Sequence, residues 1–287
     1  HLGFLGSLAL VGAITPQELR HPGSDLGIFQ KALAKAGLTE NSILDARRSP
    51  STIAGYLELH IEQGNRLNTS ADDIAVVTSI VGLRRQKVTY IGRADHAGTI
   101  SMKERRDAGQ GAAALMLSSR RLVMKEFPES VVNTGTIEFS PGAMNIVPQR
   151  AQLTLEFRAP KPHDLEQLGV ALQQLVYAEA RERELDVTIE EVDGIQPVQM
   201  DGQVQAAFVA AAERLDLCHR RMASGAGHDA QVMAKICPAG MIFVPSVDGC
   251  SHSAHEFTEW EDCINGANVL LQTAVAGIPS ADRPRTG

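Results

Sequence analysis

The chain has 287 residues, 44% of them hydrophobic, and a formal net charge of −7. This length is enough for one large domain or two domains of ordinary size, with a large buried core. The negative charge argues against nucleic acid and against an anionic membrane surface as partners. The four cysteines, Cys218, Cys237, Cys250 and Cys263, form no CxxC pair and are too sparse for a disulfide scaffold. We therefore expect reduced thiols that pack as small apolar groups, and a cytoplasmic location.

The first 14 residues are apolar, but they have the features of neither a signal peptide nor a membrane span. No basic segment precedes the apolar residues, no small-residue cleavage site follows them, and they are too short to cross a bilayer as a helix. Because no initiator Met is present, we expect this segment to be the interior of a longer protein. Residues 25–37 then predict a helix that ends on Gly37, a residue suited to a helix C-cap.

Two strands are predicted next. Residues 55–64, with the sequence GYLELHIEQG, alternate like a strand and place His60 and Gln63 at its end. Residues 74–81 are rich in β-branched side chains, as expected of a buried strand.

The middle of the chain predicts the element order β-α-β-β-α-β. Its strands alternate polar and apolar residues and its helices have helical spacing, with strands at 85–92, 131–139, 151–157 and 185–192 and helices at 103–125 and 164–184. This order is the split βαβ, ferredoxin-like arrangement, an antiparallel sheet with two helices on one face. The other face and the edges of such a sheet offer a surface for dimerisation.

After Pro197 the chain returns to α/β character. We predict helices at 201–214 and 259–276 and a buried strand at 240–245. A glycine-rich loop is predicted at 223–230 and a polar loop at 246–256. The simplest architecture is an α/β domain interrupted by an α+β domain. The predicted boundaries are 1–81 and 197–277 for the first, 82–196 for the second and 278–287 for a tail.

His60 and His252 are the leading candidates for metal ligands. Each ends or follows a predicted buried strand, the position at which open α/β sheets gather ligands from distant parts of the chain. A lone histidine is more often a hydrogen-bonded structural residue. Two histidines in such positions leave the two interpretations about equally supported.

His96 and Asn145 are candidates within the inserted domain. Asp95 next to His96, between glycines, could orient the imidazole toward a ligand, although an ordinary polar loop explains it as well. Asn145 could donate a hydrogen bond to a carbonyl or a carboxylate, although a turn-forming Asn is commoner.

Arg84, Arg158 and His228 complete the candidates. The two arginines lie at strand boundaries, where a guanidinium fork could match a carboxylate or only solvate the surface. His228, in the glycine-rich loop, could face a substrate or support another residue that does. The sequence contains no GxSxG segment of the kind that carries a nucleophilic serine.

Several segments together, and in this order, resemble the N-carbamoyl-L-amino-acid hydrolase and allantoate amidohydrolase family: GYLELHIEQG, IVGLRR, GRADHAGT, SGAGHDAQ and MIFVPSVDGCSHS. These are two-metal amidases related to aminoacylase-type metallopeptidases. The resemblance implies an aminopeptidase-like α/β catalytic domain, incomplete here, with an inserted ferredoxin-like domain that serves as dimerisation domain or lid. It also implies a homodimer, a small ureido or carbamoyl substrate, and two divalent ions per subunit (Zn, Mn, Co or Ni).

The resemblance also implies roles for individual residues. His60 and His252 match ligands of separate metal positions, and His96 matches a catalytic histidine that stabilises the oxyanion in the active site of the partner subunit. The residues that match substrate-binding positions are Gln63, Arg84, Asn145, Arg158 and His228.

In the family, a further His ligand, a bridging Asp and a Glu pair precede the matching region, so we expect this chain to lack part of the active site. We expect an N-carbamoyl-L-amino acid as substrate. The alternatives are allantoate, or a non-catalytic dimerising or ligand-binding remnant.

Overall fold

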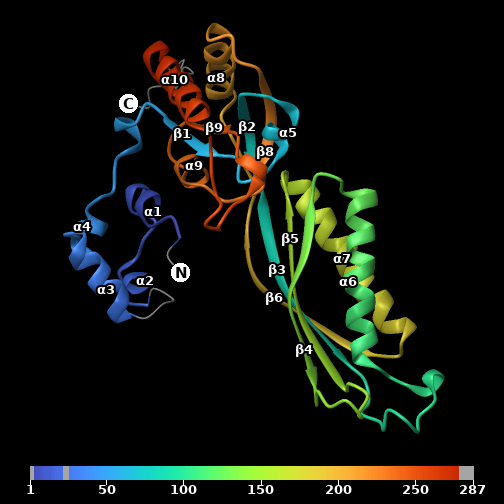
Figure 1. Cartoon of the computed structure of the whole chain (residues 1–287). Coiled ribbons are helices and arrows are strands. Elements are labelled where there is room, and N and C mark those ends of the chain that lie inside the picture. The colour runs from blue at the N-terminus through green and yellow to red at the C-terminus, as the bar shows by residue number, and fades with distance from the viewer. Residues whose placement is uncertain (1–2, 22–25, 278–287) are drawn as a thin grey trace. The chain divides into compact units, whose positions relative to one another are not determined.

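The computed structural model describes residues 3–21 and 26–277, so the predicted tail lies outside the described residues. The chain forms two compact units (Figure 1). One comprises Val81–Val198, and the other comprises the described residues on both sides of it. Within the described ranges, no helix is both long enough and apolar enough to cross a lipid bilayer.

The first unit is built on a mixed sheet with the strand order β1-β9-β2-β7, and β8 also pairs with β2. Its strands are β1 (Tyr56–Ile61), β2 (Ile74–Ile80), β8 (His219–Ser224) and β9 (Ala239–Val244), together with β7 (Val198–Gln199), which begins at the boundary residue Val198. β1 runs parallel to β9 and β2 runs parallel to β8, whereas β2 and β9 are antiparallel. The predictions of buried strands at 74–81 and 240–245 are confirmed, but β1 is half-buried along its whole length.

Two long helices cover this sheet, α8 (Gly202–Arg214) and α10 (Trp260–Ala276). Val204 and Phe208 of α8 and Val269 of α10 pack with Ile242 of β9 in one apolar core. The short helices α5 (Arg66–Ser70) and α9 (Asp229–Met233) follow β1 and β8 along the chain.

Four short helices precede the sheet along the chain. They are α1 (Leu5–Val11), α2 (Pro16–Arg20), α3 (Leu26–Lys35) and α4 (Glu40–Leu44), and they share a small apolar core of their own. The predicted helix end at Gly37 is confirmed, because Gly37 has a φ of 70° and the Leu38 N–H bonds back to the Leu33 carbonyl.

The second unit has four antiparallel strands in the order β4-β5-β3-β6, with two helices on one face (Figure 1). The strands are β3 (Gly82–Ile91), β4 (Val131–Ser140), β5 (Arg150–Ala159) and β6 (Asp186–Ile195), and the helices are α6 (Ala108–Glu126) and α7 (Pro162–Glu182). Along the chain the order is β3-α6-β4-β5-α7-β6, which confirms the ferredoxin-like prediction.

Alternation along β5 explains why this unit folds as it does. Leu153, Leu155 and Phe157 are fully buried toward the helices, and the residues between them face the other side of the sheet. The largest error among the predicted boundaries is the start of α6, which begins at Ala108 rather than at residue 103. The Asp107 carboxylate caps the helix by accepting hydrogen bonds from backbone N–H groups of its first turn. β3 begins and β6 ends three residues outside the predicted ranges.

Candidate functional site

His60 lies inside β1, where alternate residues share one face of the strand, so that Tyr56, Glu58 and His60 form a polar row. The Nδ1 atom of His60 is 2.8 Å from the carbonyl oxygen of Ile61. A carbonyl only accepts hydrogen bonds, so this Nδ1 carries the proton and Nε2 keeps its lone pair in the neutral ring. That tautomer is the one that binds a metal or accepts a proton through Nε2.

His228 supports His60 from the loop that begins α9. It is only 4% exposed, and its ring meets that of His60 edge to face with 4.6 Å between the centroids. Its Nε2 is 3.0 Å from the Ser224 Oγ, and its Nδ1 is 3.6 Å from a Glu58 carboxylate oxygen. The structure therefore places His228 behind His60 as a buried neighbour, one of the alternatives left open by the sequence.

Glu58 is a residue that the sequence analysis missed. Its carboxylate accepts a hydrogen bond of 2.7 Å from the Ala230 N–H in the first turn of α9, besides facing His228. Burial, followed by the nearby carboxylates of Glu58 and Asp229, raises the pKa of Tyr56 well above its ordinary value. The signal that could have found Glu58 is its position two residues before His60, on the same face of the strand.

Gln63 occupies a turn directly after β1. Its φ of 58° lies in the left-handed region, and its backbone N–H donates a 3.0 Å hydrogen bond to the Ser246 hydroxyl. Ser246 is fully buried. The turn that presents Gln63 is thus fixed by a buried side chain from the other end of the unit's sequence.

His252 lies in an exposed loop after β9 and also has a left-handed backbone, with φ 55°. Its N–H and the Ser251 hydroxyl both donate to the Glu256 carboxylate, at 2.9 and 2.7 Å. The Ser251 hydrogen bond, then the His252 N–H, lower the pKa of Glu256, and the imidazoles of His252 and His60 add smaller contributions. Glu256 therefore lies within electrostatic range of both histidines predicted to bind metal.

The described residues do not by themselves form a metal centre. Among them, no group of three or more His, Cys, Asp or Glu side chains is placed to hold an ion. His60 has the correct tautomer for a ligand, but one imidazole does not hold a hard divalent ion, which takes additional nitrogen and oxygen donors. The donor set of the described residues therefore does not fit a complete two-metal site.

His96 and Asn145, which lie far apart in the sequence, are brought together in the second unit. The Ala97 N–H donates to the Asn145 carbonyl, and the Val147 N–H donates to the Asp95 carbonyl, each at 2.9 Å. The Nδ1 of His96 accepts a 3.1 Å hydrogen bond from the Gly98 N–H. Its proton therefore resides on Nε2, which makes the exposed edge of His96 a hydrogen-bond donor.

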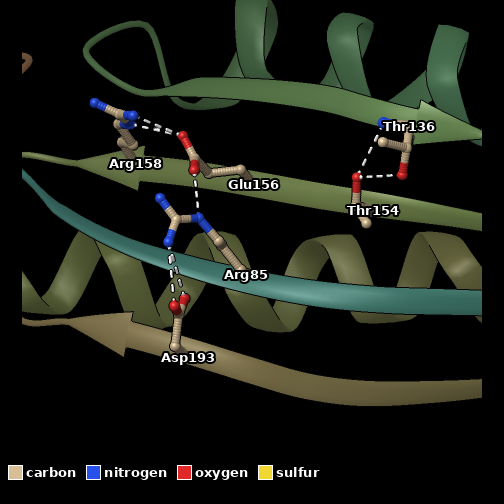
Figure 2. Close-up of polar contacts among 6 residues, drawn as sticks. All are labelled: Arg85, Thr136, Thr154, Glu156, Arg158 and Asp193. Carbon is tan, nitrogen blue, oxygen red and sulfur yellow. Dashed lines mark hydrogen bonds and ion pairs between the residues drawn. The ribbon is translucent and has the colours of Figure 1, made fainter. Parts of the chain in front are cut away.

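Arg84 and Arg158, in contrast, lie on opposite faces of their sheet. Arg84 contacts the Phe157 ring on the helix side, with 5.8 Å from its guanidinium carbon to the ring centroid, and pairs with Glu191. Arg158 belongs to the other face, where its Nε and Nη2 bind the Glu156 carboxylate at 2.9 and 2.7 Å (Figure 2). Within this unit the two guanidinium groups cannot bind one carboxylate together.

Glu156 links Arg158 to a chain of charges across three strands (Figure 2). Arg85 donates to Glu156 at 2.6 Å and to Asp193 at 3.1 Å. Burial raises the pKa of the Glu156 carboxyl, but hydrogen bonds from Arg85 and Arg158 outweigh burial and leave that pKa below its ordinary value. Glu156 is thus a carboxylate that holds Arg158 in place at neutral pH.

The expectation for the cysteines was correct only in part. Cys237 is buried, and in the described part of the chain no disulfide joins the four cysteines. Cys218, directly before β8, is exposed, however, and Cys250 and Cys263 are half-buried.

Comparisons with known proteins agree with this architecture. An N-carbamoyl-L-amino acid amidohydrolase from Geobacillus stearothermophilus is 35% identical over 271 residues, which cover 94% of this chain and 66% of the relative. An allantoate amidohydrolase from Bacillus subtilis (strain 168) is 35% identical over 269 residues, covering 93% and 65%. The crystal structure of an amidase of the hydantoinase/carbamoylase family from Burkholderia multivorans matches with a TM-score of 0.85 and 31% identity, covering 98% of this chain and 67% of that chain.

This chain therefore spans about two thirds of the length of the relatives that it matches. The model of one protein family matches residues 6–276, a range that extends over both compact units. The chain belongs to peptidase family M20/M25/M40.

Proposed function

We propose that the protein is a metal-dependent amidohydrolase that cleaves the carbamoyl (ureido) C–N bond of N-carbamoyl-L-amino acids. The observation that carries this proposal is the pair His60 and His228, in which the backbone fixes His60 with Nε2 unprotonated and a buried imidazole packs against it. Relatives named as N-carbamoyl-L-amino acid and allantoate amidohydrolases support the same class of reaction. Allantoate is the alternative substrate, because it shares the ureido group and a carboxylate.

We assign His60 and His252 to metal binding. A divalent ion bound there would supply Lewis acidity at the scissile carbonyl. The described residues provide too few metal ligands. We therefore propose that the remaining ligands come from a segment equivalent to the part of the relatives that this chain does not match. Zn, Mn, Co and Ni all remain suitable ions for a site with histidine and carboxylate ligands.

His96 is assigned to stabilising the oxyanion, since its Nε2–H is available as a donor. We propose that it acts in the active site of a second subunit, in a homodimer formed through the Val81–Val198 unit. The residues assigned to substrate binding are Gln63, Arg84, Asn145 and Arg158, whereas His228 is assigned to supporting His60, which it contacts while buried. Arg158 and Asn145 suit the substrate carboxylate, which would then compete with Glu156 for the Arg158 guanidinium. The cytoplasmic location stays a prediction.

The test is steady-state hydrolysis by a protein of the relatives' full length that contains this chain. N-carbamoyl-L-amino acids and allantoate are offered separately, before and after removal of metal by a chelator and after its return. We expect metal-dependent turnover, with the higher kcat/KM for an N-carbamoyl-L-amino acid. Absence of turnover on every ureido substrate would contradict the proposal.

The same assay on the 287-residue chain alone distinguishes the alternative, a non-catalytic dimerising or ligand-binding remnant. We expect no turnover by this chain, since no metal-binding group of three residues exists within its described part. Turnover by the chain alone would overturn our proposal that the missing ligands are required. Ureido binding without turnover by the full-length, metal-loaded protein would favour the remnant.

A further inference from the structure

Arg105 lies beside the turn that carries His96, yet neither motif nor comparison gives it a function. Its Nη2 donates to the carbonyl of Ala97 and, at 3.4 Å, to that of Ile100. The residues between these carbonyls fold back on His96, because the N–H groups of Thr99 and Ile100 both bond to its carbonyl. One guanidinium thus joins both sides of the turn.

This turn fixes the proton on the His96 ring. The Gly98 N–H, which donates to Nδ1, reaches that atom only while the turn keeps its shape. A Cβ on Gly98 would lie 3.3 Å from the His96 Cε1, so the backbone approaches the ring as closely as a glycine allows. A change in the turn therefore changes which nitrogen of His96 is protonated.

We propose that Arg105 is the positioning residue for His96, holding the turn so that the ring presents Nε2–H as a donor. The inference rests on the proposed role of His96 in the reaction, but the position of the proton is a property of this chain alone. A lysine at 105 retains the charge, but its side chain ends one bond short of the Nη2 atom, which alone donates to both carbonyls. The Arg105 Nε is buried with no hydrogen-bond partner in the described part of the chain, so a lysine forfeits no bond at that atom.

The neighbouring Arg106 provides a matched control. It is also half-buried, but its guanidinium binds the Glu184 carbonyl and, at 3.3 Å, the Asp186 carboxylate. Arg106→Lys therefore changes the same residue type, one position along the chain, without touching the carbonyl groups of the His96 turn.

The experiment records imidazole nitrogen spectra and amide exchange of the ¹⁵N-labelled 287-residue chain. We expect the wild type to show His96 as the Nε2–H tautomer and to protect the Gly98 amide. In Arg105→Lys the His96 nitrogens should shift toward an average of both tautomers, with Gly98 exchange accelerated about 10-fold, the effect of losing about 1.4 kcal/mol of protection. Arg106→Lys should leave both signals as in the wild type.

Several outcomes would overturn the proposal. They are a wild-type His96 protonated on Nδ1, an Arg105→Lys spectrum identical to the wild type, and an equal change in Arg106→Lys. The wild-type spectrum decides the first point even if Arg105→Lys fails to fold. Arg105→Gln then replaces it, since its amide ends at the position of Nε, which meets neither carbonyl.

A kinetic measurement connects this role to the reaction. In the full-length protein, Arg105→Lys should lower kcat about 10-fold and leave KM nearly unchanged, because a donor to the oxyanion acts mainly in the transition state. A change in KM alone would contradict a role through His96. If the wild type hydrolyses no ureido substrate, the proposed function is wrong. The spectra still decide, independently of activity, whether Arg105 positions His96.

Discussion

The imidazole rings of His60 and His228 lie edge to face, with 4.6 Å between their centroids. His228 is buried and touches Ser224, Glu58 and the Phe243 ring, whose centroid is 5.5 Å away. The arrangement combines aromatic packing with polar partners on both ring nitrogens. Substitutions at His228 can remove the polar contacts alone or the polar contacts and the packing together.

We expect His228→Phe to keep the packing but lose the polar contacts, and His228→Ala to lose both. Buried groups left without partners cost about 1–3 kcal/mol, so His228→Phe should lower the free energy of unfolding by about that amount and His228→Ala by more. Urea unfolding of the 287-residue chain measures both. His255→Ala, on an exposed loop histidine, is the control and should lie within about 0.5 kcal/mol of the wild type. Equal stabilities for all variants would contradict a structural contribution from the ring.

The turn at Gln63 makes a second prediction. A glycine adopts its left-handed φ without a Cβ penalty, so Gln63→Gly should be neutral or stabilise the fold by up to about 1 kcal/mol. Ser246→Ala should destabilise it by about 1–3 kcal/mol, because the Gln63 N–H then loses its buried acceptor.

Thermal unfolding followed by circular dichroism compares these two variants. In the full-length protein, Gln63→Gly should also raise KM if the amide binds substrate. A destabilised Gln63→Gly would show that the side chain itself supports the fold. An unchanged KM would remove Gln63 from the substrate site.

The pH dependence of stability should reveal the Glu156 contacts. The folded-state pKa of Glu156 lies below its ordinary value of 4.5, so the unfolded chain takes up the proton first as the pH falls. The contribution of Glu156 to stability is therefore complete above about pH 4.5 and is lost as the pH falls through the folded-state pKa.

Denaturant unfolding between pH 7 and pH 3 checks this sign. We expect Glu156→Gln to lose stability at pH 7 and to show a shallower decline than the wild type below about pH 4.5. Glu138→Gln, on an exposed glutamate of the edge strand β4, serves as the control and should follow the wild-type curve. Parallel curves for the wild type and Glu156→Gln would contradict the assignment.

The sequence could predict the helices and strands whose apolar residues recur at a regular spacing. Alternation along residues 151–157 indicated β5, and the order of strands and helices indicated the ferredoxin-like unit. It could not place Arg84 and Arg158 on opposite faces, because that follows from the pairing of Arg84 with Phe157 across two strands. The approach of His96 to Asn145 likewise depends on an isolated pairing between loops, for which no local pattern exists.

Some of what was missed had a signal in the sequence. Asp107 directly before an alanine-rich segment is a helix N-cap, and it would have corrected the start of α6. Glu58 shares a strand face with His60 and could have been paired with it on that ground alone. The buried Ser246 had none, because its partner Gln63 lies 183 residues away.

Glycine positions in the first unit provide a final prediction on packing. A Cβ at Gly240 would lie 2.4 Å from the Val204 Cγ1 and 3.1 Å from the Phe208 ring, so β9 can approach α8 only without a side chain there. Gly240→Ala should therefore destabilise the chain by about 1–3 kcal/mol. At Gly202, which begins α8, a Cβ would meet no described atom within 4 Å, so Gly202→Ala should be neutral or stabilising by up to about 1 kcal/mol. Urea unfolding of both variants tests this contrast, and a Gly240→Ala variant as stable as Gly202→Ala would show that α8 can move away from the sheet at little cost.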